Sequence, residues 1–173
     1  RVEDVCPASV RYLALLDRLI IREVSNGNDE LSYKQSRYLI NNANDQQVFS
    51  AVEESPWCSR QCCPDSRRRA FNTRIHDNFG IEVLRLARPL CACACCCWCA
   101  LPESGCSHEA AICHPSGTMV GFVRQRVSFA ACDFVVEDGR GKQLLLIDGP
   151  SLSAICGSKN NSFTVKTCLG KQI

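Results

Sequence analysis

The chain has 173 residues, 46% hydrophobic and 22% charged, which is enough for one domain with a sizeable core and too balanced for a disordered protein. Its formal net charge of +2 excludes a strongly basic nucleic-acid-binding protein, judged by overall charge, so we expect no nucleic-acid partner. No run of about 18 or more apolar residues occurs, and we expect no segment of this sequence to cross a bilayer as a helix.

The number of cysteines limits how completely they can pair as disulfides within the chain. There are 15 cysteines, and this odd number excludes a complete intramolecular disulfide framework. The sequence starts at Arg1 and shows no secretory signal, in which a basic segment, an apolar core and a small-residue cleavage site follow one another. We therefore expect reduced thiols and a trimmed N-terminus.

The first apolar run extends from Tyr12 to Val24. It predicts a strand, a bend and a second strand, although its first half suits a helical turn equally well. The residues at 26–29, Asn-Gly-Asn-Asp, then predict a turn. Helical periodicity is poor in the rest of the chain, whereas short runs with β-branched and aromatic residues recur, so we predict an all-β protein.

Four later segments share one pattern, in which an apolar strand leads through Asn, Asp or Gly into a second apolar strand. They are SRYLINNANDQQVFSA, FNTRIHDNFGIEVLRL, DFVVEDGRGKQLLLI and SFTVKTCLGKQI. Superposing them aligns Asp45, Gly80, Gly141 and Gly170, each followed two residues later by Gln or Glu. Each segment predicts a hairpin whose turn needs a residue that tolerates positive φ. The irregular spacings of 35, 61 and 29 residues favour a meander or barrel of hairpins over a uniform solenoid.

The last of these hairpins differs from the others in length. Its returning strand stops at Ile173, whereas the matching strands continue several residues beyond Val48, Val83 and Leu144. A sheet that stopped there would have a short unpaired edge. We therefore expect that the natural protein continues and that this chain is a fragment.

The most unusual stretch is RPLCACACCCWCAL, which holds the cysteines Cys91, Cys93, Cys95, Cys96, Cys97 and Cys99. Four interpretations compete: a thiolate metal cluster, a disulfide scaffold, an S-acylation site and structural cysteines in a buried loop. A zinc site would use two pairs of cysteines, each separated by three residues, Cys58 with Cys62 and Cys93 with Cys97. Further candidate zinc ligands are Cys106, His108, Cys113 and His114. The spacing offers many equivalent ligand choices rather than one defined set, so zinc is the weaker alternative.

S-acylation explains adjacent cysteines better, because each thiol is modified independently and several acyl chains on one loop add their membrane affinities. Burying one CH2 group contributes about 0.8 kcal/mol, and a stable anchor needs two signals, such as two chains or one chain with basic residues. From Arg60 to Arg88 the sequence has seven arginines and three carboxylates, a net charge of +4. Anionic cytoplasmic lipid attracts such residues by about 1 kcal/mol each. The predicted membrane-facing basic residues are Arg67, Arg68, Arg69, Arg85 and Arg88.

The order of several motifs resembles the phospholipid scramblase family. Cys58, Cys62, Cys63 and Pro64 are followed by FNTRIHDNFGIEVLRLARPL, the cysteine run, PSGTMVGFVRQ, FVVEDGRGKQLLLIDGP and SFTVKTCLGK. The resemblance extends from about Leu13, and it implies a partial scramblase domain over 12–173 after an N-terminal flank at 1–11. It also implies the fold of the tubby-like proteins, an antiparallel β-barrel of hairpins around a C-terminal apolar helix, whose last strands and helix lie beyond this chain.

In that family the cysteine run is palmitoylated, and the matching positions here are Cys95, Cys96, Cys97 and Cys99, with Cys91 and Cys93 as additional candidates. Trp98 stands where the family has Pro, and Ala100 where it has its last Cys, which implies fewer acylation sites. The insertion PESGCS at 102–107 adds Cys106. The calcium-binding segment and the apolar helix of the family correspond to positions beyond Ile173, and its nuclear-import motif only begins at Gly170 and Lys171. Calcium is therefore an expected cofactor without a ligand in this sequence.

The resemblance implies calcium-activated, ATP-independent, bidirectional movement of phospholipids between leaflets. The protein would be anchored by palmitate at the cytoplasmic face of the plasma membrane or another cellular membrane. Its expected partners are the phospholipid membrane, anionic lipids and other proteins. The alternatives are a membrane-tethered lipid- or protein-binding signalling module without transport activity, and a zinc-stabilised domain.

No catalytic residue is predicted. The three histidines, His76, His108 and His114, match no catalytic motif. The carboxylates Asp133, Glu137, Asp138 and Asp148 are expected to be solvated strand ends. The function predicted from the sequence is therefore not that of an enzyme.

Overall fold

The computed structural model describes residues 11–24, 36–54, 70–89, 108–128, 131–150 and 162–173. Within these ranges it contains the 3-10 helix η2 (Tyr12–Leu15) and ten strands. The strands are β1 (Leu19–Val24), β2 (Arg37–Asn42), β3 (Gln47–Glu54), β4 (Phe71–Asp77), β5 (Glu82–Arg88), β6 (Glu109–Cys113), β7 (Met119–Gln125), β8 (Phe134–Asp138), β9 (Gln143–Asp148) and β10 (Thr164–Thr167). The all-β prediction is confirmed. The first apolar run divides into a helical turn and one strand rather than two strands.

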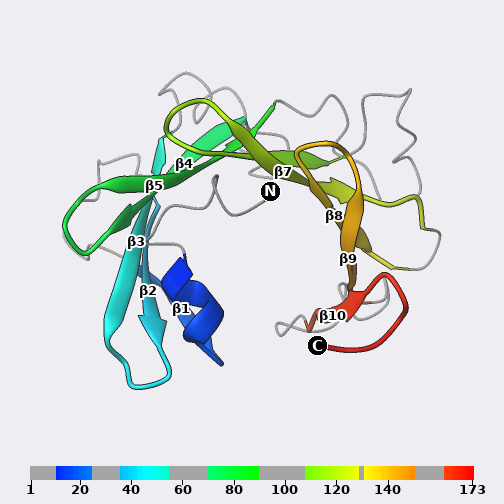
Figure 1. The fold of residues 1–173 in the computed structure, drawn as a ribbon, viewed down its shortest axis with the longest axis horizontal. Coiled ribbons are helices and arrows are strands. Elements are labelled where there is room, and N and C mark those ends of the chain that lie inside the picture. Colours follow the sequence, from blue (N-terminus) through cyan, green and yellow to red (C-terminus); the bar gives the residue numbers. More distant parts are fainter. Residues whose placement is uncertain (1–10, 25–35, 55–69, 90–107, 129–130, 151–161) are drawn as a thin grey trace, which may run out of the picture.

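The strands form a single sheet in the order β1 to β10, so that neighbours in the sequence are also neighbours in the sheet. Every ladder is antiparallel. Figure 1 shows that the sheet curves strongly, with β1 and β10 at the two ends of an open arc. The predicted meander of hairpins is confirmed, and in the described part of the chain the sheet is not closed into a barrel.

Five tight turns share one backbone geometry. The fourth residue of each turn has a positive φ, between 61° and 88°, and these residues are Asp45, Gly80, Gly117, Gly141 and Gly170. This residue donates its N–H to the carbonyl oxygen of the first turn residue, and the first residue donates to the carbonyl oxygen of the fifth. Four of the positions are those aligned in the sequence, so the four predicted turns are confirmed. Gly117 marks a fifth turn that the sequence pattern did not indicate.

The first residue of each turn also fixes the turn through its side chain. Oδ1 of Asn42, of Asp77 and of Asp138 each accepts two backbone N–H groups of its own turn, at 2.9–3.0 Å. His114 Nδ1 accepts from the N–H of Ser116, and Thr167 Oγ1 from that of Lys171, both at 3.2 Å. Short Asn and Asp side chains reach the backbone two residues ahead, which explains their place in these turns.

The meander places the tight turns at one rim of the sheet, which we call the turn rim, and the longer connections at the other, the connection rim. The turn rim comprises residues 42–46, 77–81, 114–118, 138–142 and 167–171. At the connection rim, Glu54 pairs with Asn72, and Phe71 pairs with Arg88. Because consecutive antiparallel strands run in opposite directions, tight turns and longer connections alternate along the chain and lie at opposite edges of the sheet. No residue therefore belongs to both rims.

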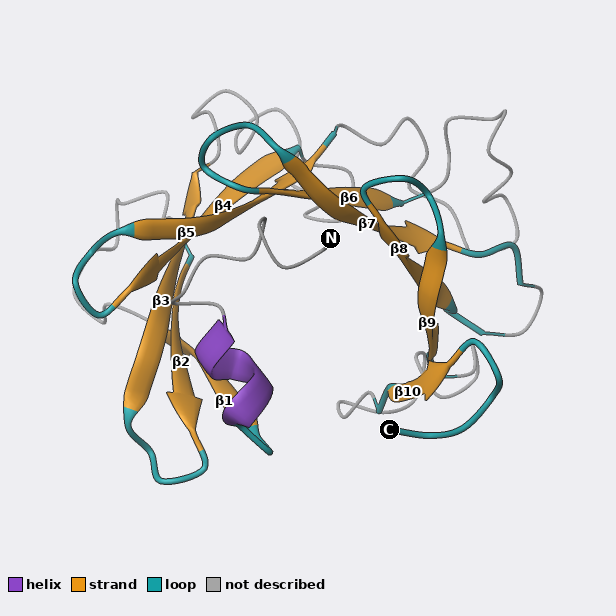
Figure 2. Ribbon diagram, in the orientation of Figure 1, coloured by secondary structure: helices purple, strands orange, loops and turns teal. Residues whose placement is uncertain are grey.

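The core lies on the first half of the sheet. The buried apolar residues that form it are Ile40, Val48, Phe49, Ala51 and Val83. Leu13 of η2 and Leu16, which follows this helix, pack against them. Figure 2 shows η2 inside the curve of the sheet, beside the first strands. The short helix therefore covers part of the inner face that would otherwise be open to water.

Candidate functional site

Most residues predicted to form the membrane anchor lie outside the described ranges. These are Cys91, Cys93, Cys95, Cys96, Cys97, Cys99, Arg67, Arg68 and Arg69, and their roles stay predictions. The structure does place the residues that flank them. Glu54 and Ala70 flank the arginine segment, and Arg88 and His108 lie close to the ends of the cysteine segment. All four belong to the connection rim, so both segments begin and end at neighbouring strands, β3 to β6.

Arg85 and Arg88 are the two predicted basic residues that the structure describes. The guanidinium carbon of Arg88 lies 4.5 Å from the centroid of the Phe71 ring, directly across the β4–β5 ladder. This cation–π contact holds a positive charge at the connection rim. Arg85 instead forms an ion pair with Glu82 at 2.9 Å, so its charge is partly balanced within the protein.

An open cavity of about 290 Å³ lies at the connection rim beside Arg88. Its lining residues are Phe71, Arg88, His108, Glu109, Ala110, Val123 and Phe134. The walls are mainly apolar, with aromatic rings contributed by β4 and β8, and they carry one guanidinium and one carboxylate. Such a lining suits an apolar chain that has a polar end. Arg88 and His108, which lie close to the two ends of the cysteine segment in the sequence, both contribute to the lining.

Of the four carboxylates expected to be solvated strand ends, Asp138 and Asp148 are the last residues of β8 and β9. Glu137 departs furthest from that expectation, because its side chain is only 11% exposed and it accepts a hydrogen bond from Arg124. Asp133 Oδ1 accepts from the N–H of Gly149 at 3.1 Å, and Asp148 pairs with Lys166. Cross-strand pairing of this kind cannot be inferred from the sequence around any one carboxylate.

Local hydrogen bonds lower the pKa of two carboxyl groups at the turn rim. The backbone N–H of Lys142 is the main cause that lowers the pKa of Asp138, with the N–H of Arg140 adding to it. For Asp45, the side-chain hydrogen bond from Asn41 lowers the pKa most, followed by the charge of Arg22, whose Nη1 lies 2.7 Å away. Both carboxyl groups are therefore ionised at neutral pH and accept the hydrogen bonds that stabilise their turns.

The described part of the chain contains no group of three or more His, Cys, Asp or Glu side chains that could hold a metal ion. The candidate ligands His108 and His114 lie at opposite rims, at the two ends of β6. Cys113 is a free thiol, with its Sγ 3.8 Å from Met119 Sδ. The remaining zinc candidates, Cys58, Cys62, Cys93, Cys97 and Cys106, lie outside the described ranges. Among the residues that the structure describes, none are gathered into a calcium or zinc site.

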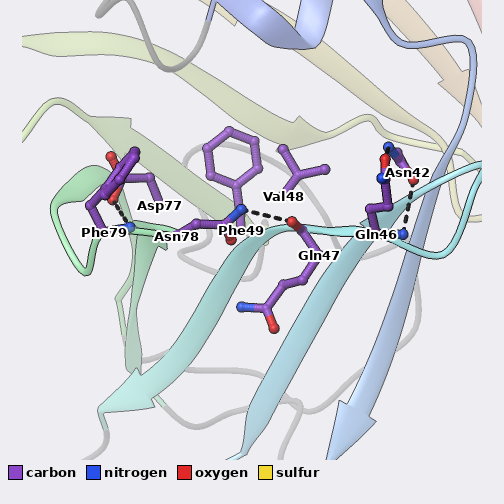
Figure 3. A pocket seen from close by; sticks show the side chains of 8 residues that line it. All are labelled: Asn42, Gln46, Gln47, Val48, Phe49, Asp77, Asn78 and Phe79. Atoms are coloured by element: carbon purple, nitrogen blue, oxygen red, sulfur yellow. Dashed lines mark hydrogen bonds between the residues drawn. The ribbon is translucent and has the colours of Figure 1, made fainter.

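A larger cavity, about 420 Å³, lies at the turn rim between the first two tight turns. Its lining residues are Asn42, Gln46, Gln47, Val48, Phe49, Asp77, Asn78 and Phe79, and Figure 3 shows them spread over both turns and the start of β3. Asn78 Nδ2 donates to the carbonyl oxygen of Gln47 at 2.8 Å and ties the second turn to that strand.

This cavity was not predicted from the sequence. A signal was available in the aligned hairpins, because Phe79 occupies the turn position that Asn44 occupies in the first hairpin. A large apolar side chain there cannot be buried by its own turn, and Phe79 is 88% exposed. The cavity itself depends on two turns lying side by side, which the alignment does not give.

No helix among the residues that the structure places combines the length and the apolar character needed to cross a membrane.

Comparison with known proteins identifies the family. The family model described as Scramblase matches residues 2–173. The chain is 34% identical to phospholipid scramblase 1 of Mus musculus, over 88% of this chain and 45% of that protein. It is 34% identical to phospholipid scramblase 2 of Homo sapiens, over 87% of this chain and 49% of that protein.

A third relative, phospholipid scramblase family member 5 of Homo sapiens, is 33% identical over 93% of this chain and 57% of that protein. The chain thus spans about half the length of the curated relatives it matches. No solved structure matches it. The match to the family model over nearly all residues shows that this chain belongs to the scramblase family.

Proposed function

We propose that the protein containing this chain moves phospholipids in both directions between membrane leaflets, without ATP and under calcium activation. The observation that carries this proposal is the scramblase family match over residues 2–173. Movement between leaflets makes and breaks no covalent bond, so the protein needs no nucleophile or general base. It must instead lower the barrier that the apolar bilayer core presents to a polar headgroup.

We further propose that palmitate on Cys95, Cys96, Cys97 and Cys99 anchors the protein to a cytoplasmic membrane face. Support comes from topology: the described residues that flank the cysteine run and the arginine segment share the connection rim. An acylated loop beside basic residues supplies the two signals that stable anchoring needs. The cation–π contact of Arg88 keeps another positive charge at the same rim.

Calcium activation is proposed only because the chain belongs to the scramblase family. The described residues offer calcium no group of ligands, and no residue of this chain is proposed to bind it. What this chain contributes is a curved sheet that the acylated loop would tether to the membrane from its connection rim. The apolar cavity at that rim has a charged end at Arg88, which matches the chemistry of a lipid at the interface.

Anchoring is tested by replacing Cys95, Cys96, Cys97 and Cys99 together with Ala in the full-length protein. We expect the variant to move from the membrane fraction to the soluble fraction, and hydroxylamine, which cleaves thioesters, to do the same to the wild type. Replacement of Cys113 and Cys168, free thiols near the turn rim, is the matched control and should leave partition unchanged. Membrane partition that survives hydroxylamine would remove the anchoring claim.

A second candidate is a membrane-tethered module that binds lipid headgroups or proteins without moving lipids. The cavities at the two rims favour it, since each has the size and mixed lining of a ligand site. Liposomes reconstituted with the full-length protein separate the two functions, because a binding module gives vesicle binding without transfer between leaflets. A zinc-stabilised domain is a third, weaker candidate, and purified protein without zinc would exclude it.

A further inference from the structure

The turn-rim cavity has an electrostatic character opposite to that of a phosphate site. Among its eight lining residues the one ionic side chain is the carboxylate of Asp77. The nearby Arg22 is engaged by Asp45, which belongs to the first turn but not to the lining. A cavity with one carboxylate and no lining cation repels a phosphate and attracts a positive charge.

Acceptor atoms remain available in the lining after the turn hydrogen bonds are counted. Asp77 uses Oδ1 for both N–H groups of its turn, at 2.9 Å each, and its Oδ2 bonds to no described residue. Asn78 uses its Nδ2 to hold Gln47, which leaves its side-chain oxygen as an acceptor. Carboxylate and amide oxygens are the partners that an N–H donor with positive charge prefers.

An exposed aromatic ring completes the set. Phe79 lines the same cavity and is 88% exposed, and Ile81 in the same turn is 62% exposed. The face of an aromatic ring attracts an ammonium group, and a carboxylate beside the ring adds to that attraction. The Asp77 cap holds the backbone N–H groups of Phe79 and Ile81, so both side chains are presented on a fixed turn.

We propose that the cavity between the first two tight turns binds the ammonium group of a phospholipid headgroup, primary or quaternary, with Asp77 and Phe79 as its main contacts. The choice of a lipid as the source of the ammonium rests on the proposed function. The exposed side chains of Phe79 and Ile81 favour a membrane lipid as the ligand, because a turn with two exposed apolar side chains can enter the interfacial region beside the headgroups. The site is weak by itself and acts at the high local concentration of a membrane surface.

Repetition of the turn supplies matched variants. Asp77→Asn removes the charge and keeps the cap, since Asn42 caps the first turn in the same way. Asp138→Asn makes the same change in a turn that does not line the cavity, and is the control. Phe79→Asn introduces the residue found at the equivalent position of the first turn, and Leu169→Asn, also at an exposed turn position, is its control.

The probes are glycerophosphoethanolamine and glycerophosphocholine, with glycerol phosphate as the probe that lacks an ammonium. Binding to the full-length protein is followed by NMR through the amide signals of Phe79 and Ile81. We expect both ammonium probes to change the chemical shifts of these amide signals, and glycerol phosphate to leave them unchanged. Asp77→Asn or Phe79→Asn should weaken binding about two- to fivefold, as expected for a cation–π contact or ion pair at an exposed site. The controls should bind as the wild type does.

The proposed ammonium site would be contradicted if glycerol phosphate shifted the amide signals as much as the ammonium probes do. It would also be contradicted if Asp77→Asn bound these probes as tightly as the wild type. Tighter binding of N-acetyl-lysine amide than of both headgroup probes would also overturn it, in favour of a protein partner. Lipid transfer between leaflets is measured on the same preparations, so that the two proposals fail separately. Lipid transfer without ammonium binding would contradict only the proposed ammonium site. Ammonium binding without lipid transfer would contradict only the proposed transport function.

Discussion

Arg124 lies directly opposite Glu109 in the β6–β7 ladder and donates from Nε to Oε2 at 2.6 Å. The same guanidinium donates to Glu137 on β8 and lies over the ring of Phe122, 4.5 Å from its centroid. The hydrogen bond that Arg124 donates to Glu109 is the main cause that raises the pKa of Arg124. One side chain therefore links three consecutive strands across the middle of the sheet.

Arg124→Met should destabilise the protein by about 1–3 kcal/mol, because it leaves the carboxylate of Glu137, 11% exposed, without its cation. Unfolding by denaturant, followed by circular dichroism, measures this change. Arg22→Met removes the exposed pair with Asp45 and should change stability by less than about 1 kcal/mol. Equal losses for the two variants would show that the network on β7 contributes no more than a surface ion pair.

Glycine substitutions should separate backbone strain from steric overlap. A Cβ at Gly80 meets no atom within 4 Å, so Gly80→Ala suffers only from its φ of +77°, by about 1–2 kcal/mol. A Cβ at Gly121 would lie 2.3 Å from the carbonyl oxygen of Glu137, which is backbone and cannot turn away. We expect Gly121→Ala to lower the melting temperature more than Gly80→Ala, and the reverse order would contradict the register of the β7–β8 ladder.

The acid titration of Asp45 should occur below its ordinary pKa of 3.8. Since folding lowers this pKa, the group stabilises the protein above the unfolded-state pKa. This contribution disappears as pH falls through the folded-state value. Arg22→Met should raise the pKa of Asp45 without restoring its ordinary value, because the bond from Asn41 is the larger cause. Carboxyl carbon chemical shifts report both changes, and a pKa fully restored by Arg22→Met would contradict this assignment.

The basic residues should differ in their effect on membrane binding. In a background without the anchoring cysteines, replacing Arg67, Arg68 and Arg69 with Gln should weaken sedimentation with phosphatidylserine vesicles, about fivefold for each arginine near the surface. Arg85→Gln should have a smaller effect, because Arg85 pairs with Glu82. Added salt should reduce the difference between the triple variant and its parent. An effect of Arg85→Gln as large as that of the triple variant would contradict the distinction.

Local sequence was sufficient to predict four of the five tight turns in the part of the chain that the structure describes. Asn42, Asp77 and Asp138 each carry the short side chain that caps a turn, and a residue tolerant of positive φ follows three positions later. The turn at Gly117 was missed because its first residue is His114, whose imidazole takes over the acceptor role of an Asn or Asp side chain. Helix η2 was left open, since four residues are too few for periodicity to decide.

The sites were less accessible to sequence reasoning, because they depend on register between strands. Glu109, Arg124 and Glu137 lie 15 and 13 residues apart along the chain, and each carboxylate looks isolated in the sequence. The turn-rim cavity likewise exists only because the β3–β4 ladder sets two turns side by side. The cysteine run, by contrast, was conspicuous from composition alone.

Transfer of a fluorescent phospholipid between leaflets tests the proposed function most directly. Full-length protein is reconstituted into liposomes without ATP, and dithionite then quenches the labelled lipid in the outer leaflet. With calcium, we predict that quenching proceeds beyond the outer-leaflet fraction seen in protein-free liposomes. Quenching that stops at that fraction, while the protein remains bound to the vesicles, would contradict the account and leave a membrane-tethered binding module.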